Sequence, residues 1–311
     1  MVKSVKSVGL KNRRVQEKIF YWCVLALPLL QFCIFYIGVN FNSIVLSMQE
    51  ISQSSEGEGY VYTWVGLKNV FQNAKYLFTE YEFIQSWKNS GIAYLVGLVF
   101  GMGFALLFSF YIYKKHFLSG LFKVMLFLPS IISSVALVIM FSFFAEDGYP
   151  VLMEKLFSKQ VSGGLLGNAD TKWGTILFYT IWVGFGGSVL MYIGAMNAIS
   201  ESVVEAATLD GITPVSEFVH ITFPLIYPTF VTFFITGLAG FFTNQMNLYT
   251  FSETQVSIKH YTFGYWLFYN TSRGFTYYPK VASFGVLFTL IIAPITFFAR
   301  WLLVKIGPSV N

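Results

Sequence analysis

The stretch 90-SGIAYLVGLVFGMGFALLFSFYIY-113 contains no charged residue. A helix rises about 1.5 Å per residue, so roughly 20 apolar residues are enough to cross the ~30 Å hydrocarbon core of a bilayer. This stretch is therefore long enough to span a membrane as one helix.

Composition extends the same conclusion to the whole chain. Of its 311 residues, 55% are hydrophobic and only 11% are charged, and the mean hydropathy is +0.62. Soluble proteins carry about 25% charged residues, so a soluble enzyme, a disordered chain and a collagen-like chain are excluded. A β-barrel would show alternating segments of about ten residues. We therefore expect an all-α integral membrane protein.

Apolar runs separated by polar segments predict six transmembrane helices. The expected spans are 19–39, 90–113, 121–145, 173–195, 223–251 and 281–303. Pro129 is expected to kink the third span. Residues 67–81 have the spacing of a helix with one apolar face, lying on the membrane surface or against the bundle.

Charge predicts the orientation of these spans. Six of the twenty Lys and Arg residues lie within residues 1–18, and positive charge beside a span stays in the cytoplasm. We divide the chain into a basic cytoplasmic tail, 1–18, and a six-helix transmembrane domain, 19–311, with both termini cytoplasmic. Because the net charge of +5 is concentrated in this tail, no nucleic acid partner is expected.

The segment 196–224, between the fourth and fifth spans, is acidic although the topology places it in the cytoplasm. It holds Glu201, Glu205, Asp210 and Glu217 and no Lys or Arg. Inner loops are normally basic. This segment, called here the acidic segment, therefore suggests a basic protein partner.

Its local pattern predicts two short helices. Ser202-x-x-Glu205 has the spacing of a capping box, and Asp210-Gly211 ends the first helix because glycine adopts the left-handed C-cap conformation at little cost. Thr213-Pro214 begins the second helix, with a cap followed by proline. A short exposed helix of this kind is suited to docking in a partner's groove.

The same residues resemble a known family. Glu205-Ala206-Ala207, then Gly211, then Ile221-x-Phe223-Pro224 resemble the EAA motif of the membrane subunits of binding-protein-dependent ABC importers, although the family usually has Leu where Phe223 stands. Sugar-type permeases of the maltose and glycerol-3-phosphate importer group are resembled at further positions. These are Trp64-Val65-Gly66-Leu67, Phe83-x-x-Ser86, Asn89 and residues 277–285.

The resemblance implies a type I ABC importer permease (MetI-like) bundle with a cytoplasmic coupling helix. Glu205, Ala206, Ala207, Asp210 and Gly211 would dock on an ATPase. The implied partners are a second homologous permease subunit, two cytoplasmic ABC ATPase subunits and an extracellular substrate-binding protein, in the cytoplasmic membrane of a prokaryote. The alternative for Glu205 is that it only completes the capping box.

Polar residues in the fifth span predict a substrate path. Asn244 and Asn247 are three residues apart and are expected on one helical face, with Thr243 four residues before Asn247. Amides match sugar hydroxyls, and permeases of this group often carry Asn at this point. Gln245 and Tyr249 are further candidates. The alternative is hydrogen bonding between helices.

The fourth span adds a glycine-rich stretch to the candidates. Its residues Gly184, Gly186, Gly187 and Ser188 allow close approach of a backbone or of a ligand. We include Gly187 in the substrate path, with helix packing as the alternative.

Several constellations are missing from the sequence. It has no G-x-x-x-x-G-K-[ST] phosphate loop, so ATP and Mg²⁺ are expected on the partner ATPases and not on this chain. No catalytic nucleophile or paired carboxylates appear, and the three histidines are scattered, so no catalytic residues and no metal site are expected.

The expected function is import of a carbohydrate, in particular a neutral oligosaccharide, because the central spans lack basic residues. Another small solute such as glycerol-3-phosphate is the alternative within the family. A secondary carrier or channel is the alternative from another class, but it would need inverted repeats or ionisable groups inside the spans. A membrane-bound enzyme is a third alternative.

Overall fold

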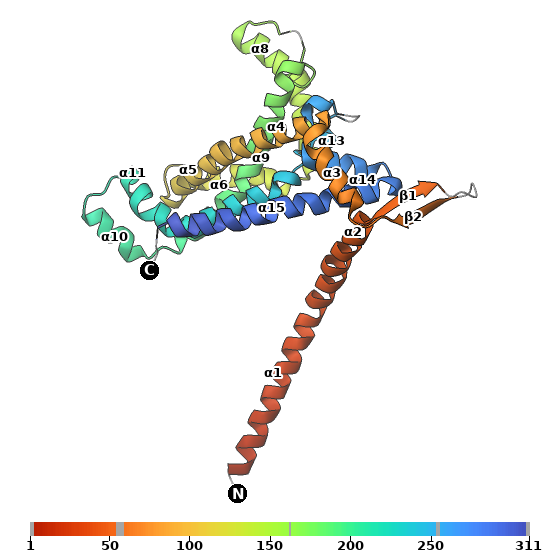
Figure 1. The fold of residues 1–311 in the computed structure, drawn as a ribbon. Coiled ribbons are helices and arrows are strands. Elements are labelled where there is room, and N and C mark those ends of the chain that lie inside the picture. Colours follow the sequence, from red (N-terminus) through yellow and green to blue (C-terminus); the bar gives the residue numbers. More distant parts are fainter. Residues whose placement is uncertain (1–2, 54–58, 162, 253–255, 309–311) are drawn as a thin grey trace. The chain divides into compact units, whose positions relative to one another are not determined.

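A computed structural model of the chain describes residues 3–53, 59–161, 163–252 and 256–308 (Figure 1). Among these residues, six helical segments are long and apolar enough to cross a bilayer, as the sequence predicts. They are Arg13–Ser47, Tyr81–Tyr113, Ser134–Phe157, Ala169–Asn197, Pro214–Phe242 and Phe275–Ile306. The chain forms two compact units, residues 1–73 with 275–286 and residues 74–274 with 287–311.

The first unit contains the first span and a hairpin. Its elements are α1 (Lys3–Gln31), η1 (Phe32–Gly38), α2 (Val39–Ser47), β1 (Gln49–Gln53), β2 (Tyr60–Trp64), the first half of α3 (Lys68–Thr79), η7 (Phe275–Tyr277) and the start of α15 (Tyr278–Ile306). Helix α1 runs through residue 18, so the predicted tail does not end at a helix boundary.

Two features of the first unit explain residues that the sequence singled out. The strands β1 and β2 pair antiparallel, with Gln49 opposite Trp64. Gly66 follows in the left-handed region at φ +63°, and its amide donates to the carbonyl of Met48. The predicted surface helix is present as α3, where Asn73 Nδ2 donates to Ser283 Oγ of α15 at 2.8 Å in a buried position.

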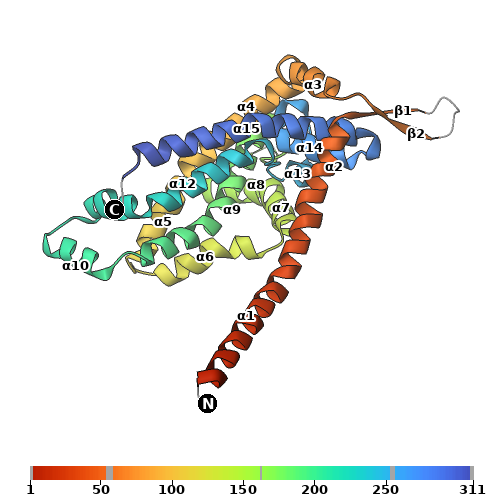
Figure 2. The same ribbon diagram turned by 60° about the horizontal axis from the view of Figure 1, so that its bottom comes forward.

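The second unit contains the central spans. In chain order it comprises α4 (Tyr81–Val96), η2 (Gly97–Met102), α5 (Gly103–Tyr113), α6 (Ser119–Ile131), α7 (Ser134–Phe143), η3 (Phe144–Gly148), α8 (Tyr149–Phe157), α9 (Ala169–Asn197), α10 (Glu201–Leu209), α11 (Pro214–Glu217), η4 (Phe218–Thr222), α12 (Phe223–Ala239), η5 (Gly240–Phe242), α13 (Leu248–Ser252), η6 (Ile258–His260), α14 (Phe263–Ser272) and the rest of α15. Helices α10 and α11 lie at one end of this unit, and α13 and α14 lie at the other (Figures 1 and 2).

Helices α5, α9 and α12 share the core of the second unit. Ala105, Val189, Tyr192 and Ile226 are buried together, and Ser109 Oγ lies 3.1 Å from the carbonyl oxygen of Val189, across the interface between α5 and α9. Because hydrocarbon offers no competing partner, a serine inside a span is stabilised by bonding a backbone carbonyl.

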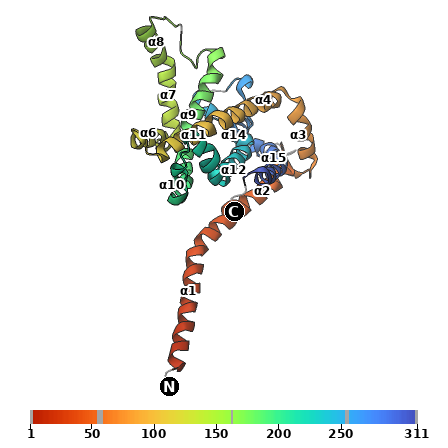
Figure 3. The same ribbon diagram turned by 90° about the vertical axis from the view of Figure 1, so that its left-hand side faces the viewer.

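The third span differs from the prediction. A continuous helix was expected over 121–145 with a kink at Pro129, but α6 ends at Ile131 and α7 begins at Ser134, with Ser133 between them as the cap residue. Helix α7 leaves α6 in a different direction (Figure 3). Pro129 lies inside α6, so the interruption falls after the proline, where Ile132 is extended.

Two predicted loops also contain helices. The loop predicted over 146–172 contains α8, and the loop predicted over 252–279 contains α14, whose Phe263, Tyr265 and Trp266 are buried. Phe263 packs edge-on against Trp87 of α4 at 5.0 Å between ring centroids. These buried aromatic side chains place α14 in the core, and the prediction of a loop over 252–279 did not include this helix.

Adjacent glycines of α9 give a test of this packing. A Cβ at Gly186 would collide with the backbone carbonyl of Leu126 in α6, whereas a Cβ at Gly187 meets nothing within 4 Å. Gly186→Ala should destabilise the protein by about 1–3 kcal/mol, and Gly187→Ala should be neutral or stabilise it by about 0.5–1 kcal/mol. Thermal unfolding of the purified protein in detergent measures both, and equal melting temperatures for the two variants would contradict this packing.

Candidate functional site

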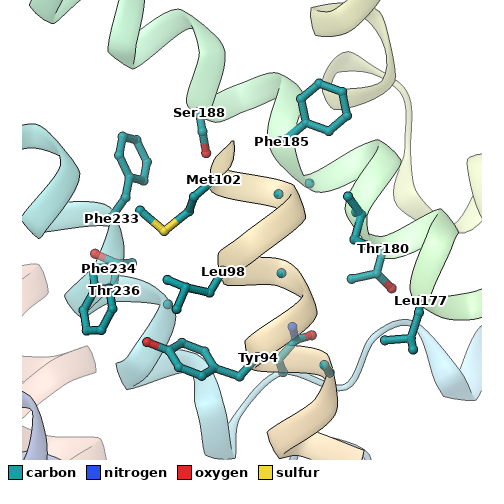
Figure 4. Close-up of a pocket in the computed structure, with 17 residues that line it drawn as sticks. Tyr94, Leu98, Met102, Leu177, Thr180, Phe185, Ser188, Phe233, Phe234 and Thr236 are labelled. Carbon is teal, nitrogen blue, oxygen red and sulfur yellow. The ribbon is translucent and has the colours of Figure 1, made fainter. Parts of the chain in front are cut away.

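A cavity of about 320 Å³ lies within the second unit, between α4, η2, α9 and α12 (Figure 4). Its lining comprises Ala93, Tyr94, Gly97, Leu98, Gly101, Met102, Leu177, Thr180, Ile181, Gly184, Phe185, Ser188, Phe233, Phe234, Thr236, Gly237 and Asn244. The volume falls at the lower end of the ~300–1,000 Å³ typical of ligand pockets. None of the lining side chains is ionisable at neutral pH, so the cavity is apolar with a few neutral polar groups.

Tyr94 is the most informative of these polar groups. Its hydroxyl is buried and has no hydrogen-bond partner in the described part of the chain, while its ring lies edge-on to Phe234 at 6.4 Å and to Phe241 at 6.2 Å. A buried hydroxyl without a partner is energetically costly. An occupant of the cavity that offers a hydrogen bond would remove that cost.

Two threonines in the cavity are already bonded within their own helices. Thr180 Oγ1 donates to the carbonyl of Ile176, and Thr236 Oγ1 donates to the carbonyl of Thr232, each at 2.8 Å. Their oxygens retain lone pairs, so these hydroxyls are acceptors for a ligand. Sequence reasoning missed Tyr94, Thr180 and Thr236, because a Tyr or Thr inside a span is also what ordinary packing would place there.

Asn244 lines the cavity from a turn, and not from the helix predicted over 223–251. The expected helix over 223–251 ends at Ala239, a 3₁₀ turn follows, and Met246 and Asn247 both have φ +53°. Asn244 and Asn247 are therefore not on one helical face, and the prediction of their shared face was wrong. Asn244 Oδ1 accepts from the amide of Met246 at 2.9 Å, a local turn that competes with the helix.

Helix α14 holds this turn in place. Thr262 Oγ1 donates to the carbonyl of Asn244 at 3.2 Å, and a Cβ at Gly264 would collide with the backbone of residues 243 and 244. Asn89 of α4 holds the start of α14, because its Nδ2 donates to the carbonyls of Lys259 and Tyr261 at 2.8 and 2.9 Å. The backbone freed by the helix break is thus satisfied by protein groups, as the membrane interior requires.

The other predicted path residues do not line this cavity. Thr243 and Tyr249 are exposed, and Tyr249 packs against Phe268 at 5.1 Å between ring centroids. Gln245 has a buried Oε1 with no partner among the described residues. Gly187 is absent from the lining, where Gly184 and Ser188 of the same glycine-rich stretch stand instead.

The acidic segment forms helices α10 and α11 as predicted, with one difference in capping. Helix α10 begins at Glu201 after Ser200, whose side chain makes no capping bond, so the predicted capping box at Ser202 was wrong. Gly211 follows the helix at φ +73°. The amide of Gly211 donates to the carbonyl of Thr208, and the amide of Ile212 donates to the carbonyl of Ala207. This pair of hydrogen bonds is that of a Schellman C-cap.

The predicted start of α11 is confirmed. Thr213 caps it by accepting from the amide of Ser216 at 3.4 Å, and Pro214 is its first residue. The acidic segment thus contains two short helices joined by residues 210–213.

The predicted docking residues are mostly exposed. Glu205, Ala206, Asp210 and Gly211 are on the surface, whereas Ala207 is only 7% exposed and faces the interior of the segment. Sequence reasoning missed Leu209, which is 89% exposed. Val203 and Val215 are exposed as well. An exposed surface that combines carboxylates with large apolar side chains is suited to binding a protein.

One acid of the segment is not available for docking. Glu217 is buried, and its Oε1 lies 2.6 Å from Nζ of Lys114 at the end of α5. Among the described residues, no group of three or more His, Cys, Asp or Glu side chains is placed to hold a metal ion.

Residues 93–311 match the family model of the binding-protein-dependent transport system inner membrane component. The chain belongs to this family. It is a multi-pass membrane transport component, in agreement with the resemblance at Glu205-Ala206-Ala207 and Gly211 and with the six predicted spans.

Individual relatives agree with the family. The chain is 26% identical over 290 residues to the lactose transport system permease protein LacF of Rhizobium radiobacter, covering 89% of this chain and 93% of the relative. It is 24% identical over 230 residues to the multiple sugar-binding transport system permease protein MsmF of Streptococcus mutans, covering 73% and 75%.

A solved structure shows the same fold. It is a bacterial alginate ABC transporter in complex with an alginate pentasaccharide-bound periplasmic protein, and one of its chains matches with a TM-score of 0.72 at 17% identity, covering 92% of this chain and 94% of that chain. The type I importer permease fold expected for this transport component is therefore confirmed.

His260 gives a pH test of the region that holds the cavity. Its ring stacks on Trp173 at 5.8 Å between centroids, and burial, followed by the charges of Lys172 and Lys259, lowers its pKa below the ordinary 6.5. Below about pH 6.5 the unfolded chain takes up the proton more readily than the folded chain, so stability should fall as pH falls.

The measurement is the melting temperature of the purified transport component between pH 8 and 5.5. His260→Gln should show a weaker decline over the acidic part of this range. An identical decline in the two proteins would mean that His260 does not contribute to it.

Proposed function

We propose that this transport component is one of two permease subunits of an ATP-driven importer for a neutral oligosaccharide. Two cytoplasmic ATPase subunits would bind and hydrolyse ATP with Mg²⁺, and an extracellular binding protein would deliver the substrate. The chain would lie in the cytoplasmic membrane of a prokaryote with both termini inside, so that the acidic segment faces the ATPases.

The observation that carries the proposal is the family match over residues 93–311, combined with an exposed acidic segment at one end of the second unit. If the acidic segment is exposed to the cytoplasm, an ATPase that closes around ATP can move this segment and, with it, the attached spans. A rigid-body switch between two packings of the spans would then open the cavity to one side and close it to the other.

The chemistry of the cavity favours a neutral sugar. Its lining offers the hydroxyls of Tyr94, Thr180, Ser188 and Thr236 and the amide of Asn244, together with three phenylalanine rings. The relatives LacF and MsmF are named for lactose and for multiple sugars. Glycerol-3-phosphate would be better served by a cationic side chain, and the lining has no Lys, Arg or His.

Docking on the ATPase can be tested by charge reversal on α10. Glu205→Lys would replace an attractive contact with a repulsive one if the partner surface is basic, and Leu209→Asp would force a charge into the interface. Both variants should lose the ATPase subunits when the complex is purified through a tag on this chain, and ATP-dependent uptake should be abolished.

Glu154→Lys is the matched control, because Glu154 is an exposed acid on α8, outside the acidic segment. It should retain the ATPase subunits. Retention of the ATPase by Glu205→Lys and by Leu209→Asp at the level of this control would rule out the docking role of α10.

The substrate role of the cavity can be tested with two tyrosines. Tyr94 and Tyr192 both have a buried hydroxyl without a partner among the described residues, but only Tyr94 lines the cavity. Tyr94→Phe should reduce uptake of the oligosaccharide roughly two- to tenfold, since one neutral hydrogen bond contributes about 0.5–1.5 kcal/mol.

Tyr192→Phe should leave uptake unchanged, because its hydroxyl lies in the core shared by α5, α9 and α12. Initial rates of uptake by the reconstituted complex compare the two variants. A larger loss for Tyr192→Phe than for Tyr94→Phe would be inconsistent with substrate binding in the cavity.

A further inference from the structure

The acidic segment has two covalent connections to the spans. Its first residues leave α9, and its last residues enter α12 through η4. Neither connection joins the span made of α4, η2 and α5, which contacts α9 through Ser109 and supplies Tyr94, Leu98 and Met102 to the cavity.

An ion pair provides the third connection. Lys114 is the C-cap residue of α5, and Glu217 is the last residue of α11. Nζ of Lys114 lies 2.6 Å from Oε1 of Glu217, and the two side chains are only 22% and 6% exposed. A pair so well shielded from water is screened little by salt.

Aromatic packing surrounds the pair. Phe218 directly follows Glu217, and its ring lies edge-on to Phe110 of α5 at 5.1 Å between centroids. Nζ of Lys114 also lies 5.9 Å from the centroid of the Phe110 ring and 5.8 Å from that of Tyr113. The end of α5 and the end of α11 are therefore joined by one ion pair that has aromatic side chains beside it.

The charge also fits the helix end. A cation in the last turn interacts favourably with the partial negative charge of the helix C-terminus, so Lys114 is attracted both to α5 itself and to Glu217. A buried carboxylate that lost this cation would be left without compensation. The contact is therefore expected to persist while the acidic segment moves, and α5 is expected to move with this segment.

We propose that Lys114 and Glu217 are positioning residues that make the span of α4, η2 and α5 follow the movement of the acidic segment. This inference rests on the proposed function, since it assumes that an ATPase moves α10. The consequence is that loss of the pair weakens the coupling of ATP hydrolysis to transport. The ATPase still docks on α10, but the span that contains Tyr94 follows the acidic segment only through its packing against α9.

The test uses the complete complex of permease, ATPase and binding protein in proteoliposomes. ATP hydrolysis and oligosaccharide uptake are measured together for the parent, Lys114→Met, Glu217→Gln and the exchanged variant with both Lys114→Glu and Glu217→Lys. Lys115→Gln is the matched control, because Lys115 is the adjacent, exposed lysine.

The single variants should keep the ATPase bound, and the number of ATP molecules hydrolysed per sugar imported should rise at least tenfold. The exchanged variant should recover much of the parental ratio, and Lys115→Gln should equal the parent. Recovery on exchange shows that the contact between the two charges matters, and the ratio separates coupling from a general loss of stability, which would lower hydrolysis and uptake together.

Three results would overturn the proposal: an unchanged ratio in the single variants, a fall of hydrolysis and uptake in proportion, or an exchanged variant that stays as defective as the single ones. The last criterion applies even if a single variant fails to assemble. Failure of the proposed function is recognised separately, because the parental complex would then show no ATP-dependent uptake at all.

Discussion

The hydrocarbon core of a membrane supplies no hydrogen bonds, and this constraint decides where each polar group of the chain lies. Ser109 bonds the carbonyl of Val189 on a neighbouring span. The backbone that leaves the helix after Ala239 is held by Thr262 and, through α14, by Asn89. The hydroxyl of Tyr94 stays without a partner among the described residues and, unlike that of Tyr192, belongs to a residue that lines the cavity.

The same constraint separates the two functional regions. The cavity is built within the spans from neutral groups, since a charge there would need compensation. The acidic segment lies at the end of the second unit and carries its charges on the surface. The exception is Glu217, which is buried and has Lys114 beside it. The chain belongs to a family of transport components, and under the proposed function these two regions move together.

Much of this arrangement could be predicted from the sequence, because apolar length and helix-ending signals act locally. The six spans and the ends marked by Gly211 and Thr213 are of this kind. The break after Ala239 was missed because residues 240–251 remain apolar enough to continue a helix, and the turn at Met246 and Asn247 depends on α14 packing beside it. The pairing of Lys114 with Glu217 joins residues far apart in the sequence, so no local signal reveals it.

Under the proposed function, the energy for transport reaches the spans from outside this chain. The most direct measurement is uptake of a labelled oligosaccharide into proteoliposomes that contain either this chain alone or the complete complex with ATP on the ATPase side. Only the complete complex should accumulate the sugar, and only with ATP. Uptake by the chain alone, at a rate that ATP does not change, would contradict it.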